Sequence, residues 1–277
     1  MSVLCDLLKK GRKMEHKLIF GKCLEIMKDI PDKSVDAIIT DPPYGTTKCK
    51  WDSVIPFSPM WEQLHRIIKP KGAIVLFGSE PFSSALRMSN VENYKYDWMW
   101  EKSHGSFATA KVQPLKRHET ILVFGKNKTI YFPQMIERKG KIRDRRKEGY
   151  IKSGKGNNID SATNPNIEFK YAKSYNPKLA YPKSILVYPN PSDKRLHSTQ
   201  KPVDLMEYLV KTYTNENETV LDFTCGSGST NIACENTRRN SIGIDNGFCK
   251  RNKIINGIQI KGLKWIEITQ LRLDGKI

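Results

Sequence analysis

Residues 38–45 read I-I-T-D-P-P-Y-G, so an apolar run ends in an acid, two consecutive prolines and a tyrosine. Proline fixes φ, has no N–H group and favours extended geometry in the residue before it. An ionised Asp likewise only accepts hydrogen bonds. Asp41, Pro42 and Pro43 thus form a group of acceptors beside the flat ring of Tyr44. Such a turn suits a planar ligand that donates hydrogen bonds, for example the amino group of a nucleobase. The plain structural alternative is a strand-ending turn with a packed tyrosine.

A second stretch that could do chemistry, L-D-F-T-C-G-S-G-S-T at 221–230, joins an apolar run to a helical pattern through two glycines. Gly226 and Gly228 allow the backbone to approach a ligand closely, and a helix start offers free N–H groups. The next apolar run ends in Asp245, at about the distance where an acid binds ribose hydroxyls in nucleotide sites. Asn231 stands where a dinucleotide fingerprint has its third glycine, which favours a nucleoside without a pyrophosphate over NAD.

Apolar runs and helical patterns alternate around these two stretches. Helical spacing occurs at 56–69, followed by Pro70, and again after Pro202 as far as residue 213. A third helix is predicted from about Ser229. Apolar strands that alternate with helices indicate an α/β protein with a doubly wound, mostly parallel sheet. The predicted strands are residues 17–20, 35–40, 73–78, 94–102, 118–126, 219–224 and 241–245.

Charge is the strongest global signal, with 47 Lys+Arg against 29 Asp+Glu and a formal net charge of +18. Such a surplus repels itself unless a polyanion binds, so nucleic acid is the leading partner and a basic surface without a partner is the alternative. The six cysteines form no C-x-x-C pair and do not cluster with the five histidines at zinc spacing. We therefore expect a reduced, intracellular protein without a metal. No apolar run approaches the roughly 18 residues of a membrane span, so no membrane partner is expected.

The composition changes between Lys126 and Arg195, a range that contains 17 Lys and Arg residues but only 6 Asp and Glu residues. The hydrophobic periodicity of the preceding segments is lost in this range. Residues 185–188 are the one short strand-like run in this region. The region reads as an inserted, loop-rich basic module, and the alternative is a solvated or disordered linker. Aromatic residues interleaved with the cations favour a contacting surface.

D-P-P-Y at 41–44, H-S-T-Q-K-P at 197–202, the glycine turn and S-I-G-I-D at 241–245 together resemble the DNA amino-methyltransferases that use S-adenosylmethionine. Their order resembles the beta group, with the catalytic turn first, the target-recognition region next and the cofactor loop last. The similarity continues through W-D-S-V-I-P-F-S-P-M-W, G-A-I-V-L-F-G-S-E-P-F, W-M-W-E-K and H-E-T-I-L-V-F-G-K. It covers most of residues 17–256 outside the basic module.

This resemblance implies a Rossmann-like methyltransferase fold with permuted motif order and an inserted basic target-recognition region. The expected division is an N-terminal extension (1–16), a catalytic half (17–126), the insert (127–196) and a cofactor-binding half (197–277). The implied reaction is transfer of a methyl group to adenine N6 at a specific duplex DNA site, by base flipping and in-line displacement. Cytosine N4 as the target, a weak or inactive DNA-binding relative, and an RNA or protein substrate remain open.

The resemblance also implies roles for single residues. The glycine turn would hold the methionine part of the cofactor and Asp245 its ribose, while Lys201 and Thr199 would bind its carboxylate. The implied catalytic residues are Asp41, Pro42, Pro43 and Tyr44. The implied cofactor-binding residues are Cys23, His197, Thr199, Lys201, Asp222, Gly226, Ser227, Gly228 and Asp245. The candidate DNA-binding residues are Arg138, Arg143, Arg145 and Arg146.

The sequence departs from the family's pattern at three places. Lys22 stands where an Asp is usual, Phe223-Thr224 where Pro-Phe is usual, and Ser198 where Pro is common. They predict a tuned or weaker cofactor site. Double-stranded DNA is the expected partner, in the cytoplasm of a bacterium or of a phage-infected cell, and a homodimer or a restriction-system partner is compatible with the sequence.

Overall fold

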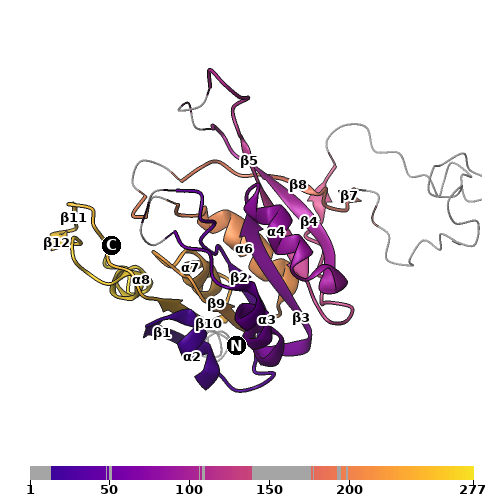
Figure 1. The fold of residues 1–277 in the computed structure, drawn as a ribbon, viewed down its shortest axis with the longest axis horizontal. Coiled ribbons are helices and arrows are strands. Elements are labelled where there is room, and N and C mark those ends of the chain that lie inside the picture. The colour runs from indigo at the N-terminus through magenta and orange to yellow at the C-terminus, as the bar shows by residue number, and fades with distance from the viewer. Residues whose placement is uncertain are drawn as a thin grey trace, which may run out of the picture. The chain divides into compact units, whose positions relative to one another are not determined.

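The computed structural model describes residues 14–47, 49, 52–105, 107, 110–138, 176, 178–191, 195–197 and 199–277 (Figure 1). The chain divides into two compact units. One unit contains the chain up to Phe132 and from Lys183 onward, and the other is Pro133–Pro182. The two units are described separately below.

The described part of the first unit contains an eight-stranded sheet in the order β1-β10-β9-β2-β3-β5-β4-β8 (Figure 1). Within it β5 runs antiparallel to β3 and β4, and the other paired strands run parallel. The expectation of a mostly parallel α/β sheet is confirmed. The strands are β1 (His16–Phe20), β2 (Val35–Thr40), β3 (Ile68–Gly78), β4 (Tyr94–Glu101), β5 (His118–Phe124), β8 (Ile185–Val187), β9 (Thr219–Asp222) and β10 (Asn240–Asp245).

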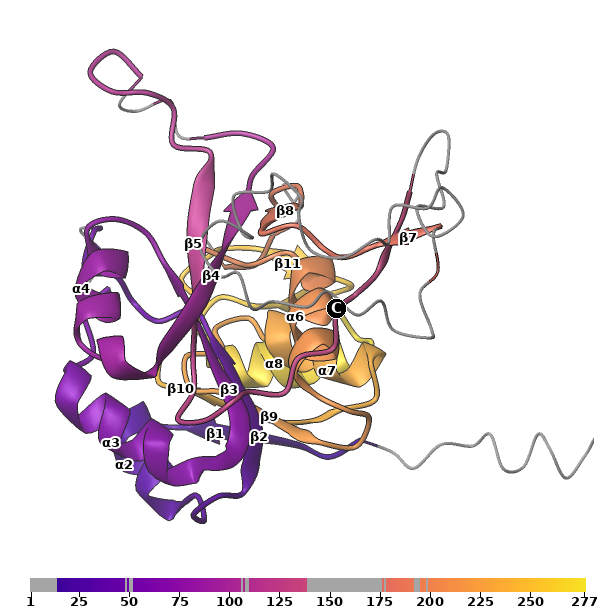
Figure 2. The same cartoon turned by 90° about the vertical axis from the view of Figure 1, so that its right-hand side faces the viewer.

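Helices cover both faces of this sheet, as Figure 2 shows, with α2, α3 and α4 on one side and α6, α7 and α8 on the other. Strand β2 is buried along its whole length, and its side chains alternate between two cores. Ile38 packs with α3 and α4, whereas Ile39 packs with α6. The helices are α2 (Cys23–Ile26), α3 (Phe57–Ile67), α4 (Phe82–Met88), α6 (Val203–Tyr213), α7 (Ser229–Asn236) and α8 (Trp265–Leu273), with short 3-10 turns at Met27–Asp29 and Val91–Asn93.

Two differences from the prediction affect the layout of the sheet. Strand β3 begins at Ile68 rather than at residue 73, because Ile68 already pairs with Val35 before a shift in register. Strand β8 lies inside the range that we assigned to the insert, yet it pairs with β4 at the end of the main sheet. Helices α2, α4 and α8 had no counterpart in the sequence prediction.

The sheet topology decides which residues meet at its edge. Parallel strands β1, β10, β9 and β2 all end on one side, so the residues that follow them lie together there. Because β5 is antiparallel, it is the beginning of β5 that lies on this side. Glu119 near that beginning is paired with Trp100, which is near the end of β4.

In the second unit, β6 (Ile136–Glu137) and β7 (Leu179–Ala180) pair antiparallel. Arg138 follows β6, and its Nε donates to the Leu179 carbonyl at 3.0 Å. The other candidate DNA-binding residues, Arg143, Arg145 and Arg146, lie outside the described residues.

Across the residues that the structure describes, no helix combines the length and the apolar composition needed to cross a membrane. The same residues contain no group of three or more His, Cys, Asp or Glu side chains arranged to hold a metal ion.

Candidate active site

A pocket of about 1190 Å³ lies where the parallel strands end. The predicted turn Asp41–Tyr44 forms part of its lining, and the glycine turn and Asp245 form another part. Pockets for one small ligand usually have about 300–1,000 Å³, so this pocket has room for two ligand groups next to each other.

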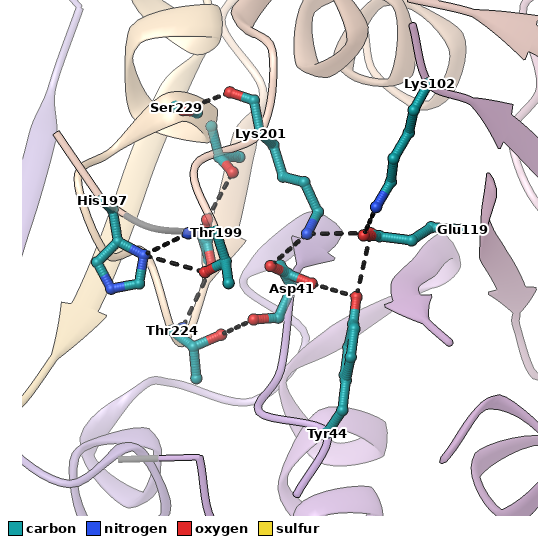
Figure 3. A network of polar contacts seen from close by, with 11 residues as sticks. Asp41, Tyr44, Lys102, Glu119, His197, Thr199, Lys201, Thr224 and Ser229 are labelled. Carbon is teal, nitrogen blue, oxygen red and sulfur yellow. Dashed lines mark hydrogen bonds and ion pairs between the residues drawn. The ribbon is translucent and has the colours of Figure 1, made fainter. Parts of the chain in front are cut away.

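The carboxylate of Asp41 accepts hydrogen bonds on both oxygens (Figure 3). The hydroxyl of Tyr44 donates to Oδ1 at 2.5 Å, and the ammonium of Lys201 donates to Oδ2 at 2.5 Å. Burial raises the pKa of Asp41, against the opposing effect of the Lys201 charge. Pro42 is buried, and it lines the pocket together with Pro43.

A second carboxylate, Glu119, lies in the same network, and the sequence analysis did not identify it. Its Oε2 is 3.1 Å from Lys201 Nζ and 3.4 Å from the Tyr44 hydroxyl, and Lys102 donates to its Oε1. Burial raises the pKa of Glu119, but the ammonium groups of Lys201 and Lys102 outweigh it and hold that pKa below its usual value. The Lys201 side chain is only 7% exposed, and although burial lowers its pKa, Asp41 and Glu119 raise it above the usual value.

Tyr44 stands with one ring face against Phe82, at 5.1 Å between ring centroids and 26° between planes. The residue is half-buried and contributes to the pocket lining. Burial, with the charges of Asp41 and Glu119, raises the pKa of Tyr44, so its hydroxyl remains a donor at neutral pH.

The glycine turn has the geometry that close approach of a ligand requires. Gly226 and Gly228 have φ values of +51° and +78°, in the left-handed region that favours glycine. A Cβ added at Gly226 would meet only the ring of His197, at 3.9 Å, so this face of the turn is open. The N–H groups of Gly226 and Gly247 donate to the carboxylate of Asp245 at 3.0 and 2.7 Å. These features fit a nucleoside such as that of S-adenosylmethionine, with Asp245 placed to accept from ribose hydroxyls.

Asp222 stabilises the glycine turn through three hydrogen bonds that its carboxylate accepts. It accepts from the Thr40 hydroxyl at 2.9 Å, the Thr230 hydroxyl at 2.5 Å and the Thr224 N–H at 3.2 Å. Burial raises the pKa of Asp222 to about 6. The hydroxyl of Thr224 donates to the carbonyl of Asp41 at 3.0 Å, so a residue that departs from the family's pattern ties the two predicted stretches together.

The segment before α6 closes one side of the pocket through Gln200. The Gln200 Oε1 accepts from the Leu196 N–H at 2.8 Å and from the Ser227 hydroxyl at 3.2 Å. His197 Nδ1 lies 3.0 Å from the Thr199 hydroxyl. Burial, aided by the charges of Lys201 and Arg251, lowers the pKa of His197 to about 4, so its imidazole is neutral at pH 7.

Helix α8 supports the glycine turn from behind. The Thr269 hydroxyl donates to the Gly226 carbonyl at 3.2 Å, and Arg272 donates to the Ser227 carbonyl. A Cβ added at Gly228 would overlap the Thr269 side chain. No motif in the sequence pointed to this contact.

The structure brings most of the predicted catalytic and cofactor residues into one pocket. Gly228 lies behind its wall, at the start of α7. Lys22, at the start of α2, is exposed and 3.6 Å from Glu25, and Phe223 is buried in the core. Burial raises the thiol pKa of Cys23. The predicted residues that line the pocket are Cys23, Asp41, Pro42, Pro43, Tyr44, His197, Thr199, Lys201, Asp222, Gly226, Ser227 and Asp245.

Known proteins resemble this chain in sequence and in fold. A family model described as DNA methylase (N6_N4_Mtase) matches residues 35–250. The chain is 30% identical over 246 residues to the Type II methyltransferase M.HpaI of Haemophilus parainfluenzae, covering 84% of this chain and 70% of that one. The crystal structure of the M1.HpyAVI–SAM complex is similar with a TM-score of 0.57 and 22% identity, covering 93% of this chain and 99% of that chain. The cytosine-N4-specific PvuII DNA methyltransferase is similar with a TM-score of 0.57 and 14% identity, covering 94% of each chain.

Proposed function

We propose that this chain, which belongs to the DNA methylase family of N6 and N4 amino-methyltransferases, methylates adenine N6 at a specific duplex DNA site. S-adenosylmethionine is the cofactor, and its sulfonium supplies the methyl group. The observation that carries the proposal is the hydrogen bond from the Thr224 hydroxyl to the Asp41 carbonyl. It holds the acceptor turn, Asp41–Tyr44, beside the glycine turn in one pocket.

The acceptor turn would act on the target amino group. The lone pair of this nitrogen is conjugated to the base and is a poor nucleophile. The Asp41 carboxylate and the Pro42 carbonyl would accept its two hydrogens and draw the nitrogen toward a tetrahedral shape. These hydrogen bonds strengthen as positive charge develops on the nitrogen, so they favour the transition state over the ground state.

Tyr44 would receive the target base on its ring. A base inside a duplex must first be flipped out, at a cost of a few kcal/mol. Stacking of a base on an aromatic ring is worth about 1–3 kcal/mol, which offsets part of that cost. Because one face of Tyr44 packs on Phe82, the ring is held in place before the base arrives.

The cofactor would bind across the ends of β9 and β10. Asp245 would accept hydrogen bonds from the ribose, and the open face of Gly226 would lie against the methionine part. Thr199 and Ser227 remain candidates for the carboxylate end. Lys201 takes a different role in this proposal, because its ammonium is already bound to Asp41 and Glu119.

The test is to identify the methylated base. Duplex DNA is incubated with the protein and S-adenosylmethionine carrying a deuterated methyl group, digested to nucleosides and analysed by mass spectrometry. We expect labelled N6-methyladenine. Labelled N4-methylcytosine would reject adenine as the target while keeping the family's reaction. Cofactor binding by calorimetry without any labelled nucleoside would instead reject the activity, and competition with RNA checks the preference for duplex DNA.

A further inference from the structure

Glu119 has no part in the reaction described so far, although it is a buried acid in the centre of the site. It is the second residue of β5, and its side chain is 12% exposed. Figure 3 shows it beside Tyr44, with Lys102 and Lys201 pointing toward it from two other segments of the chain. Its Oε2 faces both the Lys201 ammonium, at 3.1 Å, and the Tyr44 hydroxyl, at 3.4 Å.

The neighbours of Asp41 create a need for a second acceptor. Tyr44 and Lys201 each donate to Asp41 at 2.5 Å, so both of its oxygens already have a donor. The proposed reaction requires the same carboxylate to accept a hydrogen from the target amino group. Positive charge develops on that nitrogen, and an ammonium held on Asp41 repels it. A second acceptor that draws the ammonium and the hydroxyl away from Asp41 would relieve this repulsion and free lone pairs on Asp41 for the target amino group.

We propose that Glu119 is this second acceptor, a positioning residue that takes over the Lys201 ammonium and the Tyr44 hydroxyl while Asp41 binds the target amino group. The inference rests on the proposed function. The exchange requires little movement, because both donors already lie within 3.4 Å of Glu119 Oε2. Lys102 binds Oε1 and so keeps Oε2 turned toward them.

The charges of the site support the same assignment. Asp41 and Glu119 carry two negative charges, and Lys102 and Lys201 carry two positive ones, so the four groups balance. An unpaired charge in a buried site is costly. Without the charge of Glu119, Lys201 would keep Asp41 as its counter-ion and compete with the substrate for it.

The pH dependence gives a signature that a purely structural role lacks. Asp41 is faced by Lys201, by Tyr44, by Glu119 on β5 and by Asp222 on β9. Burial and the Glu119 charge raise the pKa of Asp41, and Lys201 lowers it. Removing the charge of Glu119 therefore lowers the pKa of Asp41. The acid limb of the rate profile would move to lower pH, even though the maximal rate falls.

The test measures single-turnover methyl transfer against pH for Glu119→Gln, at saturating cofactor and duplex. We expect the rate at pH 8 to fall roughly 10- to 100-fold, less than the 10²–10³ loss typical of a group that touches the reacting atoms. We expect the acid limb of the rate profile to move to lower pH. The affinities for cofactor and DNA should change by less than about threefold. Glu119→Asp keeps the charge, so its rate should lie between those of wild type and Glu119→Gln. The acid limb of its rate profile should stay at the wild-type pH.

Glu101→Gln is the matched control. Glu101 ends β4, is 45% exposed and lies 3.8 Å from the cation of Arg117, outside the pocket lining. The same loss of charge should leave the rate and its acid limb at wild-type values.

A Glu119→Gln variant with the wild-type rate and an unmoved acid limb would overturn the inference. If this variant does not fold, a crystal structure of the wild-type protein with the demethylated cofactor and a target duplex decides. We expect Lys201 Nζ closer to Glu119 than to Asp41 there, and the reverse order would overturn the exchange. Failure of the proposed function looks different, because the wild-type protein itself would then transfer no methyl group to adenine.

Discussion

Asp41 follows β2 and Asp222 ends the neighbouring strand β9, but their carboxylates have different surroundings. Asp222 is 4% exposed and binds two threonine hydroxyls and a backbone N–H. Asp41 faces the pocket, and its donors are a lysine and a tyrosine that also reach Glu119. The first arrangement stabilises a loop, whereas the second can exchange its partners for a substrate.

Asp245 is the residue where cofactor affinity should be most sensitive. Loss of a hydrogen bond to a charged group costs about 1.5–3 kcal/mol, so Asp245→Ala should raise the cofactor Kd roughly 10- to 100-fold. Calorimetry with S-adenosylmethionine measures this. Asp245→Asn keeps one acceptor oxygen and should lose less, and an unchanged Kd in Asp245→Ala would remove the ribose role from this carboxylate.

His197 should make the stability of the protein depend on pH. Its pKa is lowered to about 4 in the folded protein, against about 6.5 for the unfolded chain. Between these values the unfolded chain binds more protons, so this group makes the free energy of unfolding rise with pH from about 4 to about 6.5. Going from pH 7 to pH 5, wild type should lose about 2 kcal/mol more than His197→Asn in urea unfolding. Equal losses in the two proteins would contradict the buried, neutral imidazole.

At the scale of elements, helix α8 stands out because two of its side chains bind the backbone of the glycine turn. Thr269 and Arg272 hold the carbonyls of Gly226 and Ser227. Burial lowers the pKa of Arg272 to about 10, which leaves it charged at neutral pH. The helix therefore fixes the backbone of the loop on which the cofactor would lie.

This contact can be tested at Gly228. Gly228→Ala combines a left-handed φ of +78° with an overlap between the new methyl group and Thr269. Gly257→Ala is the matched control, since Gly257 has φ +80° and nothing within 4 Å of the added Cβ. The strain of about 1–2 kcal/mol is common to both variants, and the overlap should cost Gly228→Ala roughly 1–3 kcal/mol more.

Urea unfolding and calorimetry with the cofactor measure the two effects. We expect only Gly228→Ala to lose cofactor affinity. Equal losses of stability in both variants would mean that α8 yields to the added methyl group.

The sequence predicts the strands well and the network behind Asp41 poorly, for a physical reason. Strand β2 was predicted at its observed bounds because all six of its residues avoid water, and that pattern is local. Glu119 was recognised only as part of a strand, since its meeting with Lys201 depends on the antiparallel direction of β5. The α8 contact was missed because Thr269 and Arg272 belong to no motif and act through backbone carbonyls.

At the scale of the whole molecule, the net charge of +18 should govern DNA binding. If about six phosphates are neutralised, the slope of log K against log salt concentration should be roughly −5. Replacing Arg143, Arg145 and Arg146 together with Gln should weaken binding and flatten the slope by up to about 3. Binding titrations at several salt concentrations measure this for both proteins.

Lys28, Lys71 and Lys95 provide the control for that experiment. They are exposed and lie in the 3-10 turn Met27–Asp29 or within the first four residues of β3 and β4, away from the end of the sheet that carries the pocket. Their joint replacement by Gln removes the same charge and should leave the slope close to that of wild type. Equal flattening in both triple variants would assign the slope to net charge alone.

Asp41→Ala offers the most direct measurement, because the proposed methyl transfer depends on an acceptor turn that binds the target amino group. Single-turnover methyl transfer should fall by at least about a hundredfold. Cofactor and duplex binding should stay near wild type. Asp97→Ala, which removes an acid of β4 that pairs with Arg87, should transfer at the wild-type rate. Wild-type turnover by Asp41→Ala would contradict the account.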